Sequence, residues 1–280
     1  MAIVSGESPV SRTPVSDSVR ANRLSAPVQL PSYRKIAAYL ILGAVIIWAW
    51  TGTGITFKAL VDGWPYARSF VGRMFPPHWA VWRSAVRPMI QTIQMGIIGT
   101  LIGVVIAFPI ALFAAKNLAP HPVVYYAARA VLNVGRTIPD LVLALAFVAM
   151  VGLGSFPGTL ALGVHSAFSL SKLFAESIET INPRQVEAVE SVGANRLQVI
   201  SFAVIPQALP LMLSYSLLYW ESNIRAATVL GLVGAGGIGF QLQVSMRLFR
   251  YHDLTVYILM LIVAVTIIDR ASAMLRARIT

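Results

Sequence analysis

The 280-residue sequence contains no cysteine, and only 12% of its residues are charged. Without cysteine it can form neither a disulfide nor a thiolate metal site, and it has no cysteine nucleophile. The low charge content excludes an ordinary soluble domain, in which about a quarter of the residues are charged. Because 57% of the residues are hydrophobic and the mean hydropathy is +0.72, the composition indicates an integral membrane protein with one compact membrane domain.

Histidines are also scarce, and their spacing matches no known metal or catalytic motif. His78, His121, His165 and His252 are scattered, and none belongs to an H-E-x-x-H pattern. We therefore expect no metal site, no catalytic residue and no cofactor. The net charge of +11 comes from basic residues spread between apolar runs, which favours a lipid bilayer or an anionic solute as partner and disfavours nucleic acid.

Apolar runs divide the chain into candidate membrane spans. Residues 1–34 have no apolar periodicity and predict a flexible tail, whereas the uncharged run 36–57 predicts a first transmembrane helix over residues 35–58. Residues 59–88 combine Trp, Tyr and Arg, which is typical of an external amphipathic segment at the membrane interface. Further spans are predicted in the apolar runs 89–115, 123–153, 159–174, 199–219 and 254–268. The predicted fold class is an all-α membrane protein with about six transmembrane helices.

Two polar stripes occur within these runs at helical spacing. The first is formed by Arg129, Asn133, Arg136 and Asp140, and the second by His165, Ser169, Lys172, Glu176 and Glu179. Such stripes cannot face hydrocarbon, so they must face protein or water. Arg136, Asp140 and His165 are therefore candidates for a translocation pathway. For His165 the simpler interpretation is a helix that becomes polar as it leaves the membrane.

The stretch EAVESVGANRLQVISFAVIP, residues 187–206, predicts a helical elbow. Asn182 can cap a short helix, Pro183 suits its first position, and Gln185 can complete a capping box. Gly193 permits a sharp change of direction, and a second helix is expected to begin near Asn195. The product is either an ordinary interfacial helix or a rigid knob that transmits a push from a soluble partner.

The uncharged stretch 226–246 predicts a helix–turn element instead of a span, because it contains five glycines in nine residues. The interpretations left open are a gate near the outer half of the pathway, which would include Gly234, Gly236 and Gly237, and simple close packing. Just before it, Glu221 and Arg225 lie four residues apart. They predict either an ion pair on one helix face or an arginine that binds an oxyanion and is held by the glutamate.

Residues 187–206 contain Glu187-Ala188-Val189, then Gly193 after three residues, and then Ala203-Val204-Ile205-Pro206 after nine more. This pattern resembles the EAA signature of ABC importer permeases. Val189, Ala203 and Ile205 depart from that signature, all with apolar side chains. Three further runs narrow the resemblance to phosphonate-transport permeases, over roughly residues 85–278. They are RTIPDLVLALAFV, EAVESVGANRLQVI and LSYSLLYWESNIRAATVLGLVGAGGIG.

This resemblance implies a type I ABC importer permease fold with a core over residues 89–278 and a cytoplasmic coupling helix at 183–197. Glu187, Ala188, Gly193 and Asn195 would then couple transport to ATP hydrolysis. The implied partners are two cytoplasmic ATPase subunits, a second copy of the chain, and an external substrate-binding protein. ATP would be bound by the ATPase, in keeping with the absence of a Walker motif here. The implied location is the inner membrane, with both termini in the cytoplasm.

The expected function is thus the permease subunit of an importer for phosphonates or related phosphorus oxyanions such as phosphite and phosphate esters. A permease for another small solute, such as an amino acid or phosphate, is the alternative. A membrane-embedded enzyme is disfavoured by the scattered histidines. An ion-driven secondary transporter is disfavoured because no repeated halves are visible in the sequence.

Overall fold

The computed structural model describes residues 33–54 and 56–279, and every regular element in that part is a helix. It divides into two compact units, residues 1–66 and 67–280. Nearly all of the predicted tail, residues 1–32, lies outside the described residues. Its last two residues begin the first helix, α2 (Tyr33–Gly52).

Helix α2 is apolar from Ile36 onward, as predicted, but it ends at Gly52, before Lys58, the expected end of the first span. The reason is local. Gly52 and Gly54 surround a turn in which Gly54 adopts a left-handed φ of +63° that favours glycine. The predicted amphipathic segment 59–88 begins as helix α3 (Phe57–Met74), which has no buried residue. After a break at Pro76 and Pro77 comes the short 3-10 helix η1 (Trp79–Val81).

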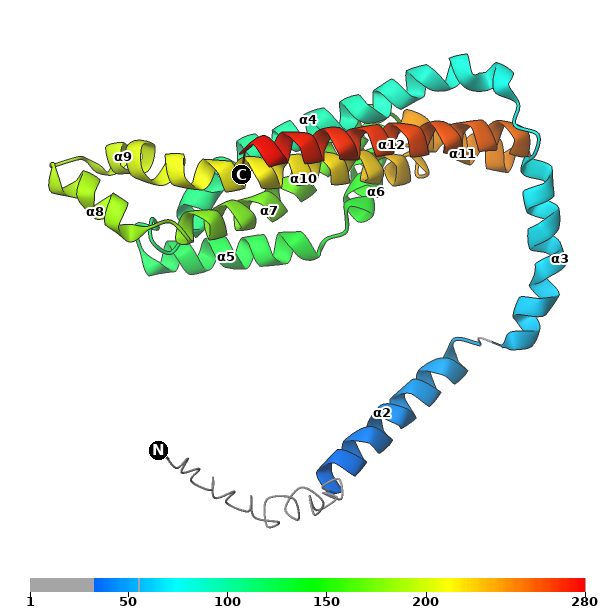
Figure 1. Ribbon diagram of the computed structural model, residues 1–280, viewed down its shortest axis with the longest axis horizontal. Coiled ribbons are helices and arrows are strands. Elements are labelled where there is room, and N and C mark those ends of the chain that lie inside the picture. Colours follow the sequence, from blue (N-terminus) through cyan, green and yellow to red (C-terminus); the bar gives the residue numbers. More distant parts are fainter. Residues whose placement is uncertain (1–32, 55, 280) are drawn as a thin grey trace, which may run out of the picture. The chain divides into compact units, whose positions relative to one another are not determined.

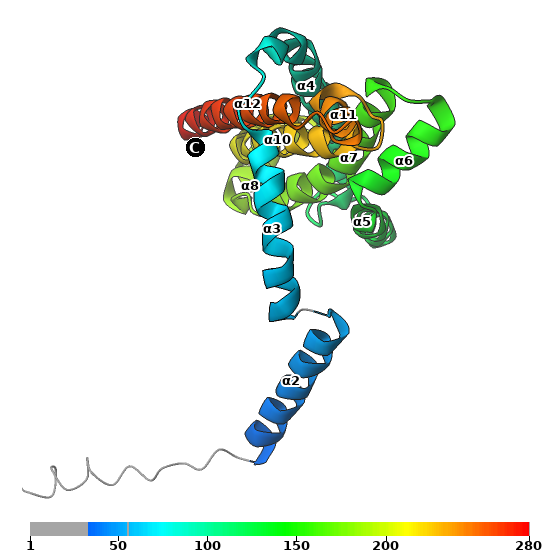
Figure 2. The same cartoon turned by 90° about the vertical axis from the view of Figure 1, so that its right-hand side faces the viewer.

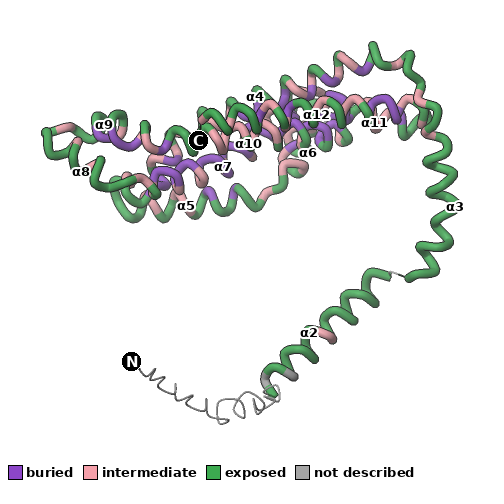
Figure 3. The backbone as a smooth tube through the Cα atoms, viewed as in Figure 1, coloured by how far each residue is buried: buried purple, intermediate pink, exposed green. Residues whose placement is uncertain are grey.

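The second unit is built on two helices, α4 (Trp82–Ala114) and α7 (Ser155–Glu179), which pack along one another (Figures 1 and 2). Small residues allow the close approach. A Cβ atom on Gly103 would lie 2.6 Å from the Cβ of Ser166, and one on Gly163 would lie 2.7 Å from Ile102. Membrane helices commonly associate through such small residues. Figure 3 shows buried residues running along α7, which is covered by its neighbours.

Helices α10 (Ile205–Gly231) and α12 (Tyr251–Ile279) complete this bundle, and α10 packs on both α4 and α7. The last predicted run, residues 254–268, was too short, because α12 spans 29 residues. Between α10 and α12 lies α11 (Gly237–Arg247), which begins after a glycine-rich turn. The glycine-rich stretch is therefore a helix–turn element, as predicted.

The third predicted span is not one helix. Helix α5 (Pro122–Thr137) and helix α6 (Asp140–Val151) meet at an angle of 83°. Pro139 has no N–H to donate, and it disfavours helical backbone at Ile138, whose ψ is 115°. Arg136 and Asp140 therefore lie on different helices, and the single stripe predicted for Arg129 to Asp140 was wrong at its last member.

Three helices of the described residues are long and apolar enough to cross a membrane: Trp79–Ala114, Arg196–Gly231 and Tyr251–Ile279. The number reaches five if the pairs α2–α3 and α5–α6 each count as one span. The sequence predicted six. The difference is α7, which is absent from this set. Because other helices cover α7, its residues need not be as apolar as those facing lipid.

Candidate functional site

The predicted elbow is present at one end of the bundle, as α8 (Pro183–Ser191) followed by α9 (Arg196–Val199) (Figure 1). Asn182 caps α8 by accepting a hydrogen bond from the N–H of Arg184 at 3.0 Å. Gly193 turns the chain with a φ of +82°. A capping box starts α9, in which Asn195 Oδ1 accepts from the N–H of Gln198 and Gln198 Oε1 accepts from the N–H of Asn195.

The capping box predicted for Gln185 is not formed. The N–H of Asn182 donates instead to Oε1 of Gln207, a residue of α10 that lies 25 positions away. The elbow is also tied to the turn after α4, because an Arg196 guanidinium nitrogen donates to the carbonyl oxygen of Leu118. These contacts join the elbow to the helices on both sides, so it can move with them as one piece.

The outer surface of the elbow is exposed and its inner surface is packed. Val186 and Val189 contact the core cluster that contains Leu132, Phe174 and Ile178. Glu187 and Ala188 are exposed, as are Gly193 and Asn195. Val192 and Leu197 are apolar but have 82% and 75% of their surfaces exposed. Exposed apolar side chains and a carboxylate on one short elbow are suited to contact with another protein.

From α9 the chain continues through a π-helical stretch, η2 (Ile200–Val204), directly into α10. Residues 196–231 thus form one continuous helical span, as expected for a second helix that starts near Asn195 and enters the membrane. A force applied at the elbow would therefore reach the middle of the bundle along α10.

The two predicted polar stripes face one another across α5 and α7. Arg129 pairs with Glu179 at 2.9 Å and with Glu176 at 3.6 Å. Further along, Lys172 Nζ donates to Asn133 Oδ1 at 3.4 Å. The stripes thus face protein, one of the two environments predicted for them.

The pathway candidates Arg136, Asp140 and His165 lie near the bend between α5 and α6. His165 is partly buried, and its Nδ1–H donates to the carbonyl oxygen of Ile138 at 3.3 Å. Arg136 is exposed in the last turn of α5, and Asp140 accepts from the N–H of Leu141 in the first turn of α6. His165 bonds the backbone at the break between α5 and α6, so its simplest role here is structural. A pathway role stays a prediction for all three.

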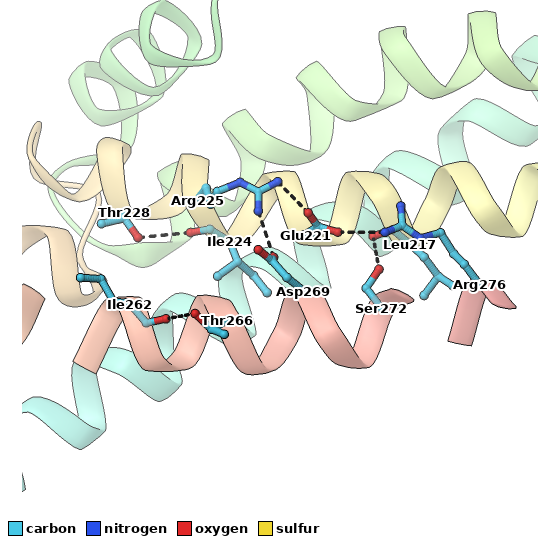
Figure 4. Close-up of polar contacts among 10 residues, drawn as sticks. All are labelled: Leu217, Glu221, Ile224, Arg225, Thr228, Ile262, Thr266, Asp269, Ser272 and Arg276. Atoms are coloured by element: carbon cyan, nitrogen blue, oxygen red, sulfur yellow. Dashed lines mark hydrogen bonds and ion pairs between the residues drawn. The ribbon is translucent and has the colours of Figure 1, made fainter. Parts of the chain in front are cut away.

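Glu221 and Arg225 form the predicted i,i+4 ion pair at 3.0 Å, in the second half of α10, which continues to Gly231 and does not end at this pair. They belong to a chain of four charges. Arg225 also pairs with Asp269 at 3.0 Å, and Glu221 also pairs with Arg276 at 3.4 Å. Figure 4 shows this network connecting α10 to α12. Its formal charges cancel, which lowers the cost of placing them in a membrane protein.

The guanidinium of Arg225 is therefore already held by two carboxylates. It also borders a cavity of about 390 Å³ between α10 and α12, together with Thr228 and Thr266. The predicted oxyanion contact would have to form at this cavity while both ion pairs persist, or replace one of them. The geometry supports the ion-pair interpretation directly, and the oxyanion role stays a prediction.

The glycine-rich turn is packed tightly against its surroundings. A Cβ atom on Gly239 would lie 1.9 Å from the carbonyl oxygen of Thr228, and one on Gly231 would lie 2.6 Å from that of Gly236. The N–H groups of Gly237 and Ile238 donate to Gln91 and Thr92 of α4. Those two groups are not free to bind an oxyanion. The close-packing interpretation thus has direct support, and a gate that includes Gly234, Gly236 and Gly237 stays a prediction.

One buried polar residue was not predicted from the sequence. Asn223 is 3% exposed, and its Nδ2 donates to Thr100 Oγ1 at 2.9 Å and to Ser166 Oγ at 2.8 Å. It thereby joins α10 to α4 and α7 at the bundle core. In the sequence Asn223 stands between Glu221 and Arg225, and the identity of its partners depends on the fold.

Comparison with protein families matches residues 107–280 to the model described as "Binding-protein-dependent transport system inner membrane component". Among characterised relatives, the phosphite transport system permease protein PtxC of Stutzerimonas stutzeri is 41% identical over 237 residues, covering 85% of this chain and 86% of the relative. The phosphate-import permease protein PhnE of Mycolicibacterium smegmatis is 38% identical over 208 residues, covering 74% of this chain and 39% of the relative.

Solved structures show the same fold at lower sequence identity. A chain of the inward-facing MetNI methionine ABC transporter has a TM-score of 0.63 and 21% identity, covering 74% of this chain and 99% of that chain. An amino acid ABC transporter has a TM-score of 0.59 and 18% identity, covering 80% and 99%. The fold is that of ABC importer permeases, as expected. Because the family model matches more than half of this chain, the chain belongs to the inner membrane components of binding-protein-dependent transport systems.

Proposed function

We propose that this chain is the permease subunit of an ATP-driven, binding-protein-dependent importer for phosphorus oxyanions, namely phosphonates, phosphite or phosphate esters. The substrate class rests on the relatives, since several that are similar over most of this chain carry names of phosphite or phosphate transport systems. The chain itself would not be an enzyme. It would form the route across the membrane, and a separate ATPase would supply the energy.

The elbow carries the transport mechanism in this proposal. Helix α8 is the coupling helix, and its exposed side would dock into a groove of the ATPase. Glu187 would pair with a basic residue there, and Val192 and Leu197 would bury their apolar surface. When the ATPase closes on ATP, it would push the elbow. Because α9, η2 and α10 are continuous, that push would tilt α10 against α4 and α7.

The proposed assembly contains two copies of the chain, two ATPase subunits and an external substrate-binding protein. Two ATP sites require two coupling helices, which a symmetric dimer of this chain would provide. Docking of the elbow to a cytoplasmic ATPase would place both termini in the cytoplasm. The N-terminal end of α4 and the α11–α12 connection would then lie on the external side.

An importer for an amino acid is the second candidate. The probable D-methionine permease MetI of Vibrio cholerae is 30% identical over 193 residues of this family region. That identity is lower than the 41% shared with the phosphite permease over 237 residues. We therefore place the phosphorus oxyanion first.

The test is purification of the tagged chain from its native membrane, followed by transport in proteoliposomes. We expect an ABC ATPase and a second copy of the chain to copurify. With the binding protein present, uptake of phosphite or methylphosphonate should depend on ATP, and D-methionine should neither be taken up nor compete. Recovery without an ATPase would contradict the importer proposal. Uptake of methionine in place of the phosphorus compounds would contradict the substrate class.

A further inference from the structure

The first turns of α4 carry a polar stripe that the proposed function does not use. Arg83, Arg87, Gln91 and Gln94 follow one another at intervals of four, four and three residues, which places them on one face of the helix. We call these residues the α4 stripe. It extends for roughly 17 Å, at about 1.5 Å per residue. Its members change from cationic to neutral and polar along the helix toward the apolar part.

Two neighbouring cavities share the α4 stripe. The larger, of about 700 Å³, is lined by all four of its residues together with Gln241 of α11. The smaller, of about 270 Å³, is lined by Gln91 and Gln94 with Ser155 and Thr159 of the first turn of α7. Because both cavities include the same two glutamines, they form one polar track from the arginines to the start of α7.

The arginines of the track have no carboxylate partner among the residues that the structure describes. The ion pairs within the described residues involve other basic groups, and neither Arg83 nor Arg87 takes part. Arg83 lies over the ring of Trp82, with its Cζ 5.7 Å from the ring centroid. This contrasts with Arg129 and Arg225, each of which is neutralised by two acidic residues. The α4 stripe therefore retains two positive charges available to an anion.

The position of the track relative to the membrane follows from the sequence of α4. Residues 88–115 are uncharged, and at about 1.5 Å per residue this run is longer than the hydrocarbon core, which is about 30 Å thick. Arg83 and Arg87 lie immediately before this run, where α4 leaves that core, and Gln91 and Gln94 lie in its first turns. In Figure 1, α4 begins at the end of the second unit that is remote from α8. With α8 facing the ATPase, the track opens on the external side.

The far end of the track meets the packed turn already described. Gln91 Oε1 accepts from the N–H of Gly237 at 3.1 Å, so this glutamine is fixed in place, and its Nε2 is left as a donor for the cavity. Gln94 and Gln241 add further amide groups that have no hydrogen-bond partner within the described part of the chain. An anion leaving the arginines would meet neutral donors, which hold it less tightly and allow it to move on.

We propose that the α4 stripe and Gln241 form an external entry site for a tetrahedral phosphorus oxyanion released from the binding protein. Arg83 and Arg87 attract and bind the anion, and Gln91, Gln94 and Gln241 pass it toward Ser155 and Thr159. This proposal rests on the proposed function for its substrate class. A lipid phosphate headgroup has the same chemistry, so the experiment must separate a free anion from a headgroup.

The absence of cysteine in the chain provides a direct test. A single cysteine at Gln94→Cys, in the assembled complex, is reacted with methanethiosulfonate reagents carrying either a sulfonate or a trimethylammonium group. The labelling of this chain is followed by mass spectrometry. We expect the anionic reagent to react at least about fivefold faster than the cationic one, because Arg87 lies about 10 Å along the helix from position 94, roughly one Debye length. Phosphite should slow the reaction.

Two variants identify the residues responsible. Arg83→Gln with Arg87→Gln should abolish the preference for the anionic reagent and the protection by phosphite. Arg247→Gln with Arg250→Gln removes the same charge, from positions that line neither cavity of the track, and should leave both intact. In proteoliposomes the first double variant should raise the phosphite concentration needed for half-maximal uptake by about tenfold. ATPase stimulation by the binding protein should be retained.

Several results would overturn the proposal. One is an equal reaction rate for both reagents, and another is no protection by phosphite in a complex that transports phosphite. Loss of ATPase stimulation in the arginine double variant would also contradict it, because the arginines would then serve docking of the binding protein. If anionic lipids in the vesicles slow the reaction and phosphite does not, the arginines bind a lipid headgroup. A complex that does not transport phosphite contradicts the proposed function instead. Its preference for the anionic reagent still decides whether the track attracts anions.

Discussion

At the scale of single residues, charged and amide side chains in this protein are placed by their partners. Arg225 is held between Glu221 and Asp269, and Asn223 is enclosed by the hydroxyl groups of two other helices. In a membrane an unpaired charge is costly, so each of these groups limits how α10 can move against its neighbours. Positions 223 and 225 of α10, only two residues apart, therefore fix two different helix contacts.

Arg225 is the residue for which structural and transport roles can be separated. Arg225→Gln leaves two carboxylates without the cation between them. Removing one member of a buried pair costs about 3–5 kcal/mol, and because Arg225 is 45% exposed we expect a loss of about 1–2 kcal/mol. Thermal unfolding of the purified complex should show it. Adding Asp269→Asn should restore most of the stability, because one carboxylate then remains.

Uptake by the same variants tests the predicted oxyanion contact. A pathway role predicts that the stabilised double variant still fails to transport, with assembly retained and partial recovery in Arg225→Lys. If Arg225→Gln with Asp269→Asn transports as well as the original chain, the residue serves the ion-pair network alone. Basal ATPase activity is the control for assembly.

At the scale of elements, the elbow shows how a few residues set a functional angle. No atom lies within 4 Å of the position that a Cβ would occupy on Gly193, so a side chain there meets open space. The constraint is the backbone, since its φ of +82° is unfavourable for residues with a Cβ. A substitution at Gly193 therefore tests the effect of backbone conformation without steric crowding of the side chain.

We expect Gly193→Val to uncouple transport from ATP hydrolysis, because a β-branched residue costs about 1–2 kcal/mol in this conformation and would change the direction of α9. Gly193→Asn is the matched control, since asparagine tolerates left-handed backbone. The number of phosphite molecules transported per ATP should fall in the first variant and stay near normal in the second. Equal ratios in the two variants would argue against a role for the elbow angle.

At the scale of the whole molecule, orientation in the membrane decides which side each site serves. Both the elbow and the α4 stripe take their proposed roles from having α8 in the cytoplasm. Basic residues give little guidance here, because they are distributed over both ends of the chain and over many loops. Orientation must therefore be measured.

Single cysteines provide that measurement, because the chain has none of its own. Ser191→Cys lies in the exposed last turn of α8, and Arg247→Cys lies at the exposed end of α11. We expect a membrane-impermeant maleimide to label Arg247→Cys in intact spheroplasts, and Ser191→Cys only after lysis. The reverse pattern would place the elbow outside, and it would contradict both the coupling proposal and the entry-site proposal.

The sequence by itself determined the features whose signals lie within a few residues of one another. The helical class followed from long apolar runs, and the elbow followed from Asn182, Pro183 and Gly193. The turn before α11 followed from its glycines, and the EAA-like spacing indicated the family. Caps, prolines and glycines act through their own backbone and nearest neighbours, so such predictions need no tertiary information.

Only the tertiary structure decided which polar groups meet. Arg225 pairs with Asp269 from 44 positions away, and Gly237 bonds Gln91 from 146 positions away. The polar track exists because α11 and the start of α7 come to lie beside the α4 stripe, whose arginines alone had indicated only a membrane interface. A helical period shows which side chains share a face, but not what that face contacts. The packing of distant helices determines the contact, and with it whether a charge is neutralised or remains available to an anion.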